Sequence, residues 1–312
     1  MADISASMVS ELRQRTGAGM MDCKKALVAC EGDMDKAAEE LRKVGAAKAD
    51  KKADRLAKDG LIRIHKNDDR HGAMLVLNCE TDFVAKGEKF QDLANDLVSY
   101  FANADLGSVP TGTSLKGEAV TAAVGLPYKD GQSVGEAIKG LIAVIGENMG
   151  LGALAVERSD NANDFLQDYL HGNRVGVLVC LTTGKPETQA SSRFREVAKD
   201  IAMQVATGVP AVAVAVSRDA IDPAIIEKER TFLLEQALQE TPGGPNFKGD
   251  PQEIAEKKVT GRMNKFFEEV SLLDQPYIRD DKIKLSDLIK TAEKDLGDTI
   301  QVVRFHRFEL GG

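Results

Sequence analysis

The sequence predicts an α+β fold with a small N-terminal three-helix bundle, a duplicated core with antiparallel sheets, and a protruding antiparallel helical hairpin. Three observations predict this fold. Apolar residues recur at helical spacing through the first 47 residues. A strand–strand–helix pattern occurs twice, at an offset of about a hundred residues. Two long amphipathic segments near the C-terminus are separated by a Pro- and Gly-rich turn at residues 241–245.

Capping residues indicate where the N-terminal helices begin. Ser5 and Asp33 are suited to cap the first and third helices, and the Thr16–Gly19 segment separates the first from the second. Apolar residues from Met34 to Val44 form the inner stripe of the third helix. The following stretch, Arg42–Lys58, is rich in basic residues and Ala, and is predicted to be a solvated helical linker.

The first copy of the repeated unit begins with a β-hairpin. Leu61–His65 and Ala73–Cys79 have strand character and are joined by a turn-rich segment. Phe90–Ala102 then reads as an amphipathic helix.

The second copy repeats these features. A His-Gly pair precedes an apolar strand in both copies, at His71 and at His171. The helix that starts near Phe90 has a counterpart near Phe194 with the same order of apolar positions. Two such units predict antiparallel sheets covered by helices on one face.

The rest of the chain completes the core and supplies the hairpin. The remaining predicted elements are helices Ser114–Val124 and Ser133–Gly146, a strand at Pro210–Val216, hairpin helices Pro223–Glu240 and Pro251–Val270, helix Leu285–Lys294 and strand Ile300–Glu309. The predicted domains are residues 1–54 (the bundle), 55–147 (first core subdomain), 148–222 with 271–312 (second core subdomain), and 223–270 (a coiled-coil-like insertion).

Composition restricts the function. The 312 residues carry 41 Lys and Arg against 49 Asp and Glu, a net charge of −8, which argues against a nucleic-acid partner. No apolar run approaches the roughly 20 residues of a membrane span, and the N-terminus has no signal-like segment. We therefore expect a cytoplasmic protein without a membrane partner.

Catalytic and ligand-binding motifs are absent from the sequence. No phosphate-binding loop, dinucleotide fingerprint, nucleophile elbow or zinc-protease motif occurs. The four cysteines form no C-x-x-C pair, and the four histidines lie far apart. We therefore predict no metal, no cofactor, no direct nucleotide binding and no covalent catalysis.

One short segment carries an unusual pattern. NCETDFVAK (Asn78–Lys86) connects a predicted apolar strand to a helix, and places Phe83 and Val84 where turns are usually polar. In one interpretation Phe83 packs back into the core and Asp82 caps the next helix. In the other, both side chains are exposed and bind a partner.

The same segment belongs to a set of blocks that resembles bacterial translation elongation factor Ts. The block Leu12–Leu27 (LR-x-x-TGAGMMDCKKAL) is similar to the first signature of that family, and NCETDFVAK to the second. Further similar blocks occur in the family's order at Ile145–Asn148, His171–Val179, Glu253–Phe266 and Glu269–Pro276.

The resemblance implies a guanine nucleotide exchange factor. Members of the family bind elongation factor Tu, both GDP-bound and nucleotide-free, and promote GDP release. By similarity, the Thr81–Val84 turn, here called the tip, is the part of the chain that promotes GDP release. Asp82 and Phe83 enter the partner's GTPase domain near its magnesium ion, with Thr81 and Val84 beside them. Phe83 acts as a wedge, and Asp82 helps to disturb the region that holds the ion.

Five further residues match partner-contacting positions of the family. Ile145 and His171 line the same contact as Phe83, and Arg13, Met20 and Met21 belong to an N-terminal, UBA-like bundle that touches the GTPase domain. Because adjacent helical residues do not share one face, we expect one of the two methionines to lie in the bundle core.

The sequence departs from the family at some positions. Val76 stands where a Glu is usual, and Gly152 and Ala153 stand where some members have basic residues. Some members continue beyond the last strand into a helical module that this chain is expected to lack. A rival interpretation takes the N-terminal bundle as a peptide- or ubiquitin-binding module, which leaves Asp82 and Phe83 unexplained.

Overall fold

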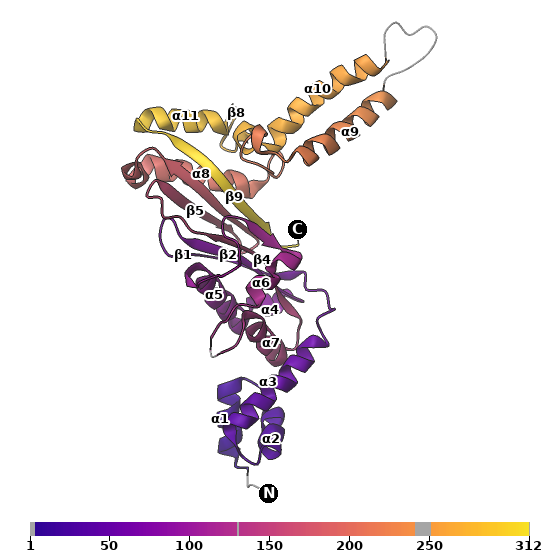
Figure 1. The fold of residues 1–312 in the computed structure, drawn as a ribbon, viewed down its shortest axis with the longest axis vertical. Helices are drawn as coiled ribbons and strands as arrows, with labels where there is room; N and C mark the ends of the chain where they lie inside the picture. The colour runs from indigo at the N-terminus through magenta and orange to yellow at the C-terminus, as the bar shows by residue number, and fades with distance from the viewer. Residues whose placement is uncertain (1–3, 130, 241–250, 312) are drawn as a thin grey trace. The chain divides into compact units, whose positions relative to one another are not determined.

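The computed structural model describes residues 4–129, 131–240 and 251–311. The chain forms two compact units (Figure 1). Their bounds are Met1–Arg158, Leu170–Gly176 and Phe308–Gly312 for the first unit, and Ser159–Tyr169 and Val177–Arg307 for the second. The predicted domain boundaries differ from this division, since the N-terminal bundle and the first core subdomain share one unit. No helix in the described ranges is long and apolar enough to cross a membrane.

The N-terminal bundle consists of α1 (Ala6–Thr16), α2 (Met20–Ala29) and α3 (Met34–Asp50). Both predicted caps are present. The Ser5 hydroxyl accepts a hydrogen bond from the Met8 amide, and the Asp33 carboxylate accepts from the Asp35 and Lys36 amides. The buried side chains that hold the bundle together are Val9, Leu12, Cys23, Ala26, Leu27 and Ala37.

Helix α3 extends further than predicted. The prediction of a solvated linker from residue 42 onward is wrong in its first half, because Gly45 and Ala49 are buried. A Cβ added to Gly45 would lie 2.9 Å from the Cβ of Ala143 on α7 (Val134–Ile145), so the two helices pack closely. Small residues mediate this contact and leave no large apolar stripe in the sequence.

The sheet of the first unit has the order β1-β2-β4-β3 and is antiparallel throughout. The predicted hairpin corresponds to β1 (Asp59–Lys66) and β2 (Gly72–Cys79). Strand β4 (Met149–Glu157) was not predicted and pairs with β2, so the first core extends past residue 147.

Helix α5 (Glu88–Asn103) packs against β1 and β2 (Figure 1). Its side chains Phe90, Leu97 and Phe101 are fully buried in the core of this unit. The short helix α4 (Asp82–Lys86) lies between β2 and α5 in the chain. The predicted helix Ser114–Val124 is instead the short strand β3 (Ser114–Lys116), a 3₁₀ turn and α6 (Thr121–Val124).

The second sheet has the order β5-β6-β9. Its strands are β5 (Asp164–His171), β6 (Val175–Thr183) and β9 (Ile300–Glu309), and the neighbouring helices are α8 (Ser192–Thr207) and α11 (Leu285–Leu296). Phe194 is the third residue of α8, as Phe90 is of α5, and both are fully buried. The predicted duplication is therefore present in the fold.

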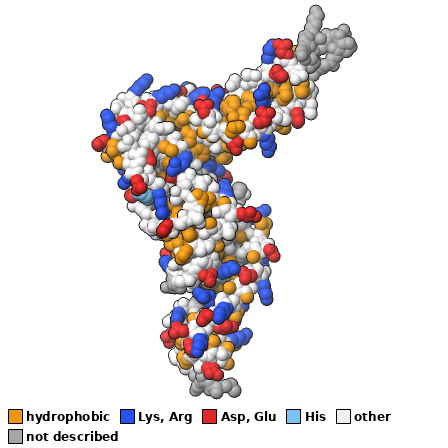
Figure 2. All heavy atoms as spheres, in the orientation of Figure 1, with side chains coloured by type: hydrophobic (Ala, Val, Ile, Leu, Met, Phe, Trp, Pro, Cys, Tyr) orange, Lys and Arg blue, Asp and Glu red, His pale blue; other side chains and the backbone are white. Residues whose placement is uncertain are grey.

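The helical hairpin consists of α9 (Pro223–Gln239) and α10 (Pro251–Val270), which pack through a small apolar core of Leu233, Ala237, Ala255, Val259 and Met263. Figure 2 shows further hydrophobic side chains on the visible surface of this hairpin. The predicted turn at residues 241–245 lies outside the described residues.

Two segments near the hairpin differ from the prediction. The predicted strand Pro210–Val216 forms only a single bridge, between Ala215 and Ser271. The short strands β7 (Pro276–Tyr277) and β8 (Asp280–Lys284) pair with each other and were not predicted.

Candidate functional site

The segment with the unusual pattern forms a tight strand-to-helix turn. Strand β2 ends at Cys79 and α4 begins at Asp82, with Thr81 in extended conformation between them. The Thr81 hydroxyl accepts a hydrogen bond from the Val84 amide at 3.4 Å and caps the helix. The interpretation in which Asp82 is the cap is therefore wrong, because Asp82 is already the first residue of α4.

Phe83 points away from the core. Its side chain is 82% exposed, more than any other large hydrophobic side chain in the described part of the chain. Its neighbour Val84 packs against the core of the first unit, and Ala85 is buried. The interpretation in which Phe83 packs back into the core is therefore wrong. A phenyl ring held in solvent forgoes about 1.5–3 kcal/mol of burial free energy, so stability does not explain its presence.

Asp82 carries a negative charge beside this ring. Its carboxylate is exposed and pairs with the Lys86 ammonium at 2.6 Å, one helical turn later. The hydrogen bond from Lys86 holds the pKa of Asp82 below its ordinary value. The tip of the turn therefore presents an anion and an aromatic ring side by side.

The turn is fixed by the loop that follows α7. The backbone N–H and the hydroxyl of Thr81 both donate to the Glu147 carboxylate, at 3.1 and 2.9 Å. In return, the backbone N–H of Asn148 donates to the Glu80 carboxylate at 2.6 Å. Residues 80–81 and 147–148 thus hold each other by three hydrogen bonds to two carboxylates.

The end of α3 reaches the same loop. The Lys52 ammonium donates to the Gly146 carbonyl at 2.6 Å, and the Asn148 side chain donates to the Arg55 carbonyl at 2.7 Å. The Arg55 guanidinium lies 3.6 Å from the Glu80 carboxylate. Three segments that are distant in sequence therefore meet behind the exposed tip.

Cys79 lies beside the turn, and its thiol is buried. Burial, with the nearby Asp59 and Glu147 carboxylates, raises the pKa of its thiol to about 12. The neutral thiol donates to the Thr81 carbonyl at 3.1 Å. Its contribution is therefore to the shape of the turn.

The structure places the other predicted site residues in three regions. Ile145 is half-buried against the same apolar core as Val84 and lies two residues before Glu147. His171 is the exposed last residue of β5, just before the turn that leads to β6. The Asn173 carbonyl of that turn accepts from the Ile62 amide, about 10 Å along β1 from the residue that pairs with Cys79.

The third region is the N-terminal bundle. Arg13, Met20 and Met21 are all exposed, the methionines at 55% and 65%. The expectation that one methionine lies in the bundle core is wrong, because Cys23, Ala26 and Leu27 supply the buried face of α2. Two long, flexible apolar side chains are therefore free to meet a protein surface.

The residues that hold the turn were not predicted as functional. Glu147 and Asn148 were noticed only as part of a family block, and Glu80 only as part of the turn. The sequence does contain one signal for these residues. Glu147 and Asn148 are polar and directly follow Gly146, the glycine that ends α7 with φ +94°.

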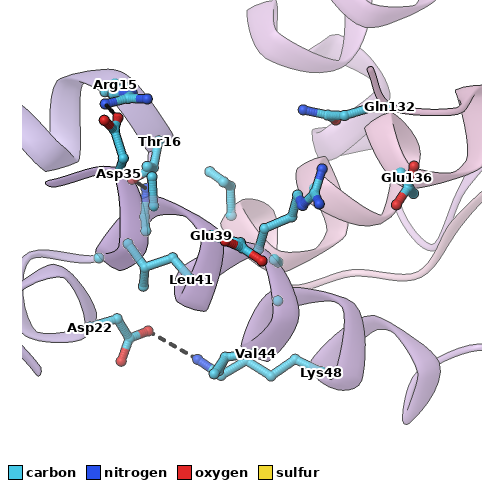
Figure 3. Close-up of a pocket in the computed structure, with 18 residues that line it drawn as sticks. Arg15, Thr16, Asp22, Asp35, Glu39, Leu41, Val44, Lys48, Gln132 and Glu136 are labelled. Atoms are coloured by element: carbon cyan, nitrogen blue, oxygen red, sulfur yellow. Dashed lines mark hydrogen bonds and ion pairs between the residues drawn. The ribbon is translucent and has the colours of Figure 1, made fainter. Parts of the chain in front are cut away.

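A groove with a volume of about 800 Å³ lies beside the N-terminal bundle (Figure 3). Four of its charged side chains form ion pairs: Arg15 with Asp35 at 2.7 Å, and Lys48 with Asp22 at 2.9 Å. Glu136 accepts from the Ser133 amide at the start of α7. Arg42 and Glu39 also line the groove. Within the described residues, no cluster of His, Cys, Asp or Glu is arranged to hold a metal ion.

Comparisons with known proteins agree with the sequence blocks. The family model described as "Elongation factor TS" matches residues 80–312. Elongation factor Ts of Nitratidesulfovibrio vulgaris (strain DP4) is 44% identical over 310 residues, covering 99% of this chain and 96% of the relative. Elongation factor Ts of Legionella pneumophila (strain Paris) is 42% identical over 313 residues, covering 100% and 93%. That of Clostridium acetobutylicum is 40% identical over 311 residues, covering 99% and 92%.

A match over most of the chain, with 40–44% identity to relatives that are covered over 92–96% of their length, shows the family. This chain belongs to the elongation factor Ts family of bacterial translation factors.

Proposed function

We propose that this protein is the guanine nucleotide exchange factor for elongation factor Tu, and that the Thr81–Val84 turn performs the exchange. The single observation that carries the proposal is the 82% exposure of Phe83 at the tip of a fixed turn. Exposed aromatic residues on rigid elements are typical anchors of protein interfaces.

The exchange step requires no covalent chemistry. Phe83 inserts beside a helix of the GTPase domain, and the Asp82 carboxylate approaches the region that holds the partner's magnesium ion. Magnesium bridges the nucleotide phosphates to the protein and supplies a large part of nucleotide affinity. Displacing its surroundings therefore weakens GDP binding.

The rigidity of the turn makes this displacement efficient. Thr81 is held by Glu147, and Glu80 by Asn148, before any partner arrives. Association therefore does not have to order the tip, and its free energy remains available to deform the partner.

Binding linkage makes the process reversible. If this chain lowers the affinity of elongation factor Tu for GDP, then GDP lowers the affinity of elongation factor Tu for this chain by the same factor. Incoming nucleotide therefore releases the exchange factor, which acts on another copy of its partner. The chain itself needs no bound nucleotide or metal ion for this role.

The N-terminal bundle supplies a second contact. Arg13, Met20 and Met21 present one charged and two apolar side chains to solvent. We assign them to recognition of the GTPase domain, with Ile145 and His171 completing the contact around the tip. Their loss is expected to raise the concentration of this chain needed for half-maximal exchange.

The direct test is release of fluorescent GDP from purified elongation factor Tu under excess unlabelled GDP. Acceleration by substoichiometric amounts of this chain is the expected result. No acceleration by the folded chain would contradict the proposal and favour a peptide-binding role for the N-terminal bundle.

A further inference from the structure

The direction in which the tip points is set by backbone contacts. Phe83 and Asp82 are exposed, so their own side chains do little to brace them against the core. Helix α4 has only five residues and cannot hold an orientation by itself. The bonds made by Glu80 and Thr81, together with the packing of Val84 and Ala85 against the core, therefore decide where the ring and the carboxylate lie.

Glu147 accepts two of these bonds. Each of its two carboxylate oxygens accepts one hydrogen bond from Thr81: Oε2 from the backbone N–H and Oε1 from the hydroxyl. A two-point contact to a planar group fixes both distance and orientation, whereas a single bond permits rotation. The Thr81 hydroxyl also accepts from the Val84 amide, so the contact extends into the first turn of α4.

Glu147 is itself held on a rigid support. Gly146 ends α7 in the left-handed conformation and turns the chain toward β2. Its carbonyl accepts from the Lys52 ammonium, which ties the loop to the end of α3. On the other side, the Asn148 amide donates to Glu80.

We infer that Glu147 is a positioning residue for nucleotide exchange, which sets the angle of the Phe83 ring through Thr81. The inference rests on the proposed function. Glu147 touches neither nucleotide nor magnesium in this role, and its effect passes entirely through the tip. A displacement of about 1 Å in a positioned group can lower a rate up to a hundredfold, so loss of this contact is sufficient to impair exchange.

The principal variant is Glu147→Ala, compared with Glu136→Ala as a matched control. Both residues belong to the α7 region and accept backbone hydrogen bonds, but Glu136 accepts from Ser133 at the opposite end of the helix. For Glu147→Ala we expect the maximal rate of GDP release, measured at a saturating concentration of the exchange factor, to fall about tenfold. The concentration of exchange factor that gives half of the maximal rate is expected to change by less than about twofold. Glu136→Ala is expected to retain the wild-type rate.

A double-mutant cycle separates positioning from a general structural role. If Glu147 acts through the ring, Glu147→Ala added to Phe83→Ala slows exchange no further. If the two losses multiply, Glu147 acts elsewhere and the inference is overturned. An unchanged rate for Glu147→Ala alone also overturns it. An unchanged rate for Phe83→Ala contradicts the proposed function instead, so the two failures are distinguishable.

Substitutions at Thr81 test the same contact without changing Glu147. Thr81→Val keeps the shape but loses the hydroxyl, and is expected to slow exchange more than Thr81→Ser, which keeps the hydroxyl. Equal rates for the two variants would contradict the inference. Circular dichroism and thermal unfolding verify that each variant is folded, and Thr81→Ser supplies a folded comparison if Glu147→Ala is not.

Discussion

Thr81 and Glu147 lie 66 residues apart in the sequence and share two hydrogen bonds, one from the Thr81 amide and one from its hydroxyl. This pair joins the strand-to-helix turn of the first core to the loop after α7. The contact explains how a five-residue helix can present an exposed phenyl ring in a fixed direction. It also places the family's second block, which contains the tip, against the block at Ile145–Asn148.

The ion pair between Asp82 and Lys86 gives a first prediction. Water screens an exposed ion pair one turn apart on a helix, so Lys86→Ala is expected to change the unfolding midpoint little. Because the substitution leaves the Asp82 carboxylate free, we expect the rate of GDP release at a saturating concentration of the exchange factor to remain near the wild-type rate. Asp82→Asn, which removes the charge, is expected to slow release.

Stopped-flow measurements of GDP release distinguish a role of the Asp82 carboxylate in exchange from a role of the Asp82–Lys86 ion pair. Equal slowing by Lys86→Ala and Asp82→Asn would mean that exchange requires the ion pair and not the carboxylate alone.

The contact between α3 and α7 gives a second prediction. Replacing a helical Gly with Ala ordinarily stabilises a helix by about 1 kcal/mol. At Gly45 the new methyl group would lie 2.9 Å from the Cβ of Ala143, and overpacking of this kind costs about 1–3 kcal/mol. Gly45→Ala is therefore expected to lower the thermal unfolding midpoint.

Gly140 on the same α7 helix is the matched control. A Cβ added there meets no atom within 4 Å, so Gly140→Ala is expected to raise the midpoint. A rise for both variants, measured by circular dichroism, would show that α3 and α7 do not pack closely in solution.

The buried thiol of Cys79 gives a third prediction, on alkaline pH. Its pKa is about 12 in the folded chain, against an ordinary value of 9.0. Above pH 9 the unfolded chain ionises this thiol while the folded chain does not, so the stabilisation present below pH 9 is lost as pH rises toward 12.

Cys79→Ser tests this effect. Serine does not titrate in this range and its hydroxyl can still donate to the Thr81 carbonyl. The free energy of unfolding of this variant, from denaturant titrations, is expected to fall less steeply with pH than that of the wild type. Some slope remains, because burial and the Asp200 carboxylate raise the pKa of Tyr277 to about 12 as well. Parallel slopes for the two proteins would contradict the assignment to Cys79.

Elements with strong periodicity and clear caps were predictable from the sequence. Ser133 and Gly146 bracket α7 as expected, and Pro251–Val270 and Ile300–Glu309 match the structure at both ends. In these segments the local pattern and the tertiary packing favour the same structure.

Other elements depend on contacts that a local pattern does not contain. Strand β4 contains two glycines that weaken its strand pattern, and it is stabilised by pairing with β2. Conversely, Pro210–Val216 alternates like a strand, with Val212 and Val214 exposed and Ala213 and Ala215 buried, but forms only one bridge. In both segments, the presence or absence of a partner strand determines whether a strand forms, and the strand propensity of the residues does not.

The candidate site was predictable only in part. The apolar residues Phe83 and Val84 marked the turn, but the sequence left open whether Phe83 is buried or exposed. Glu147 could not be assigned to the turn, because its partner Thr81 becomes a neighbour only when the fold brings the two segments together. Long-range hydrogen bonds of this kind leave no periodic signal in a single sequence.

The most direct test of the account is the maximal rate of GDP release from elongation factor Tu with Phe83→Ala at saturating concentration. Loss of an aromatic anchor typically costs 2 kcal/mol or more, so we expect the rate to fall by at least about tenfold. Phe232→Ala removes a similarly exposed ring, 60% exposed on α9, and is expected to retain the wild-type rate. A wild-type rate for folded Phe83→Ala would contradict the central claim that this ring opens the nucleotide site.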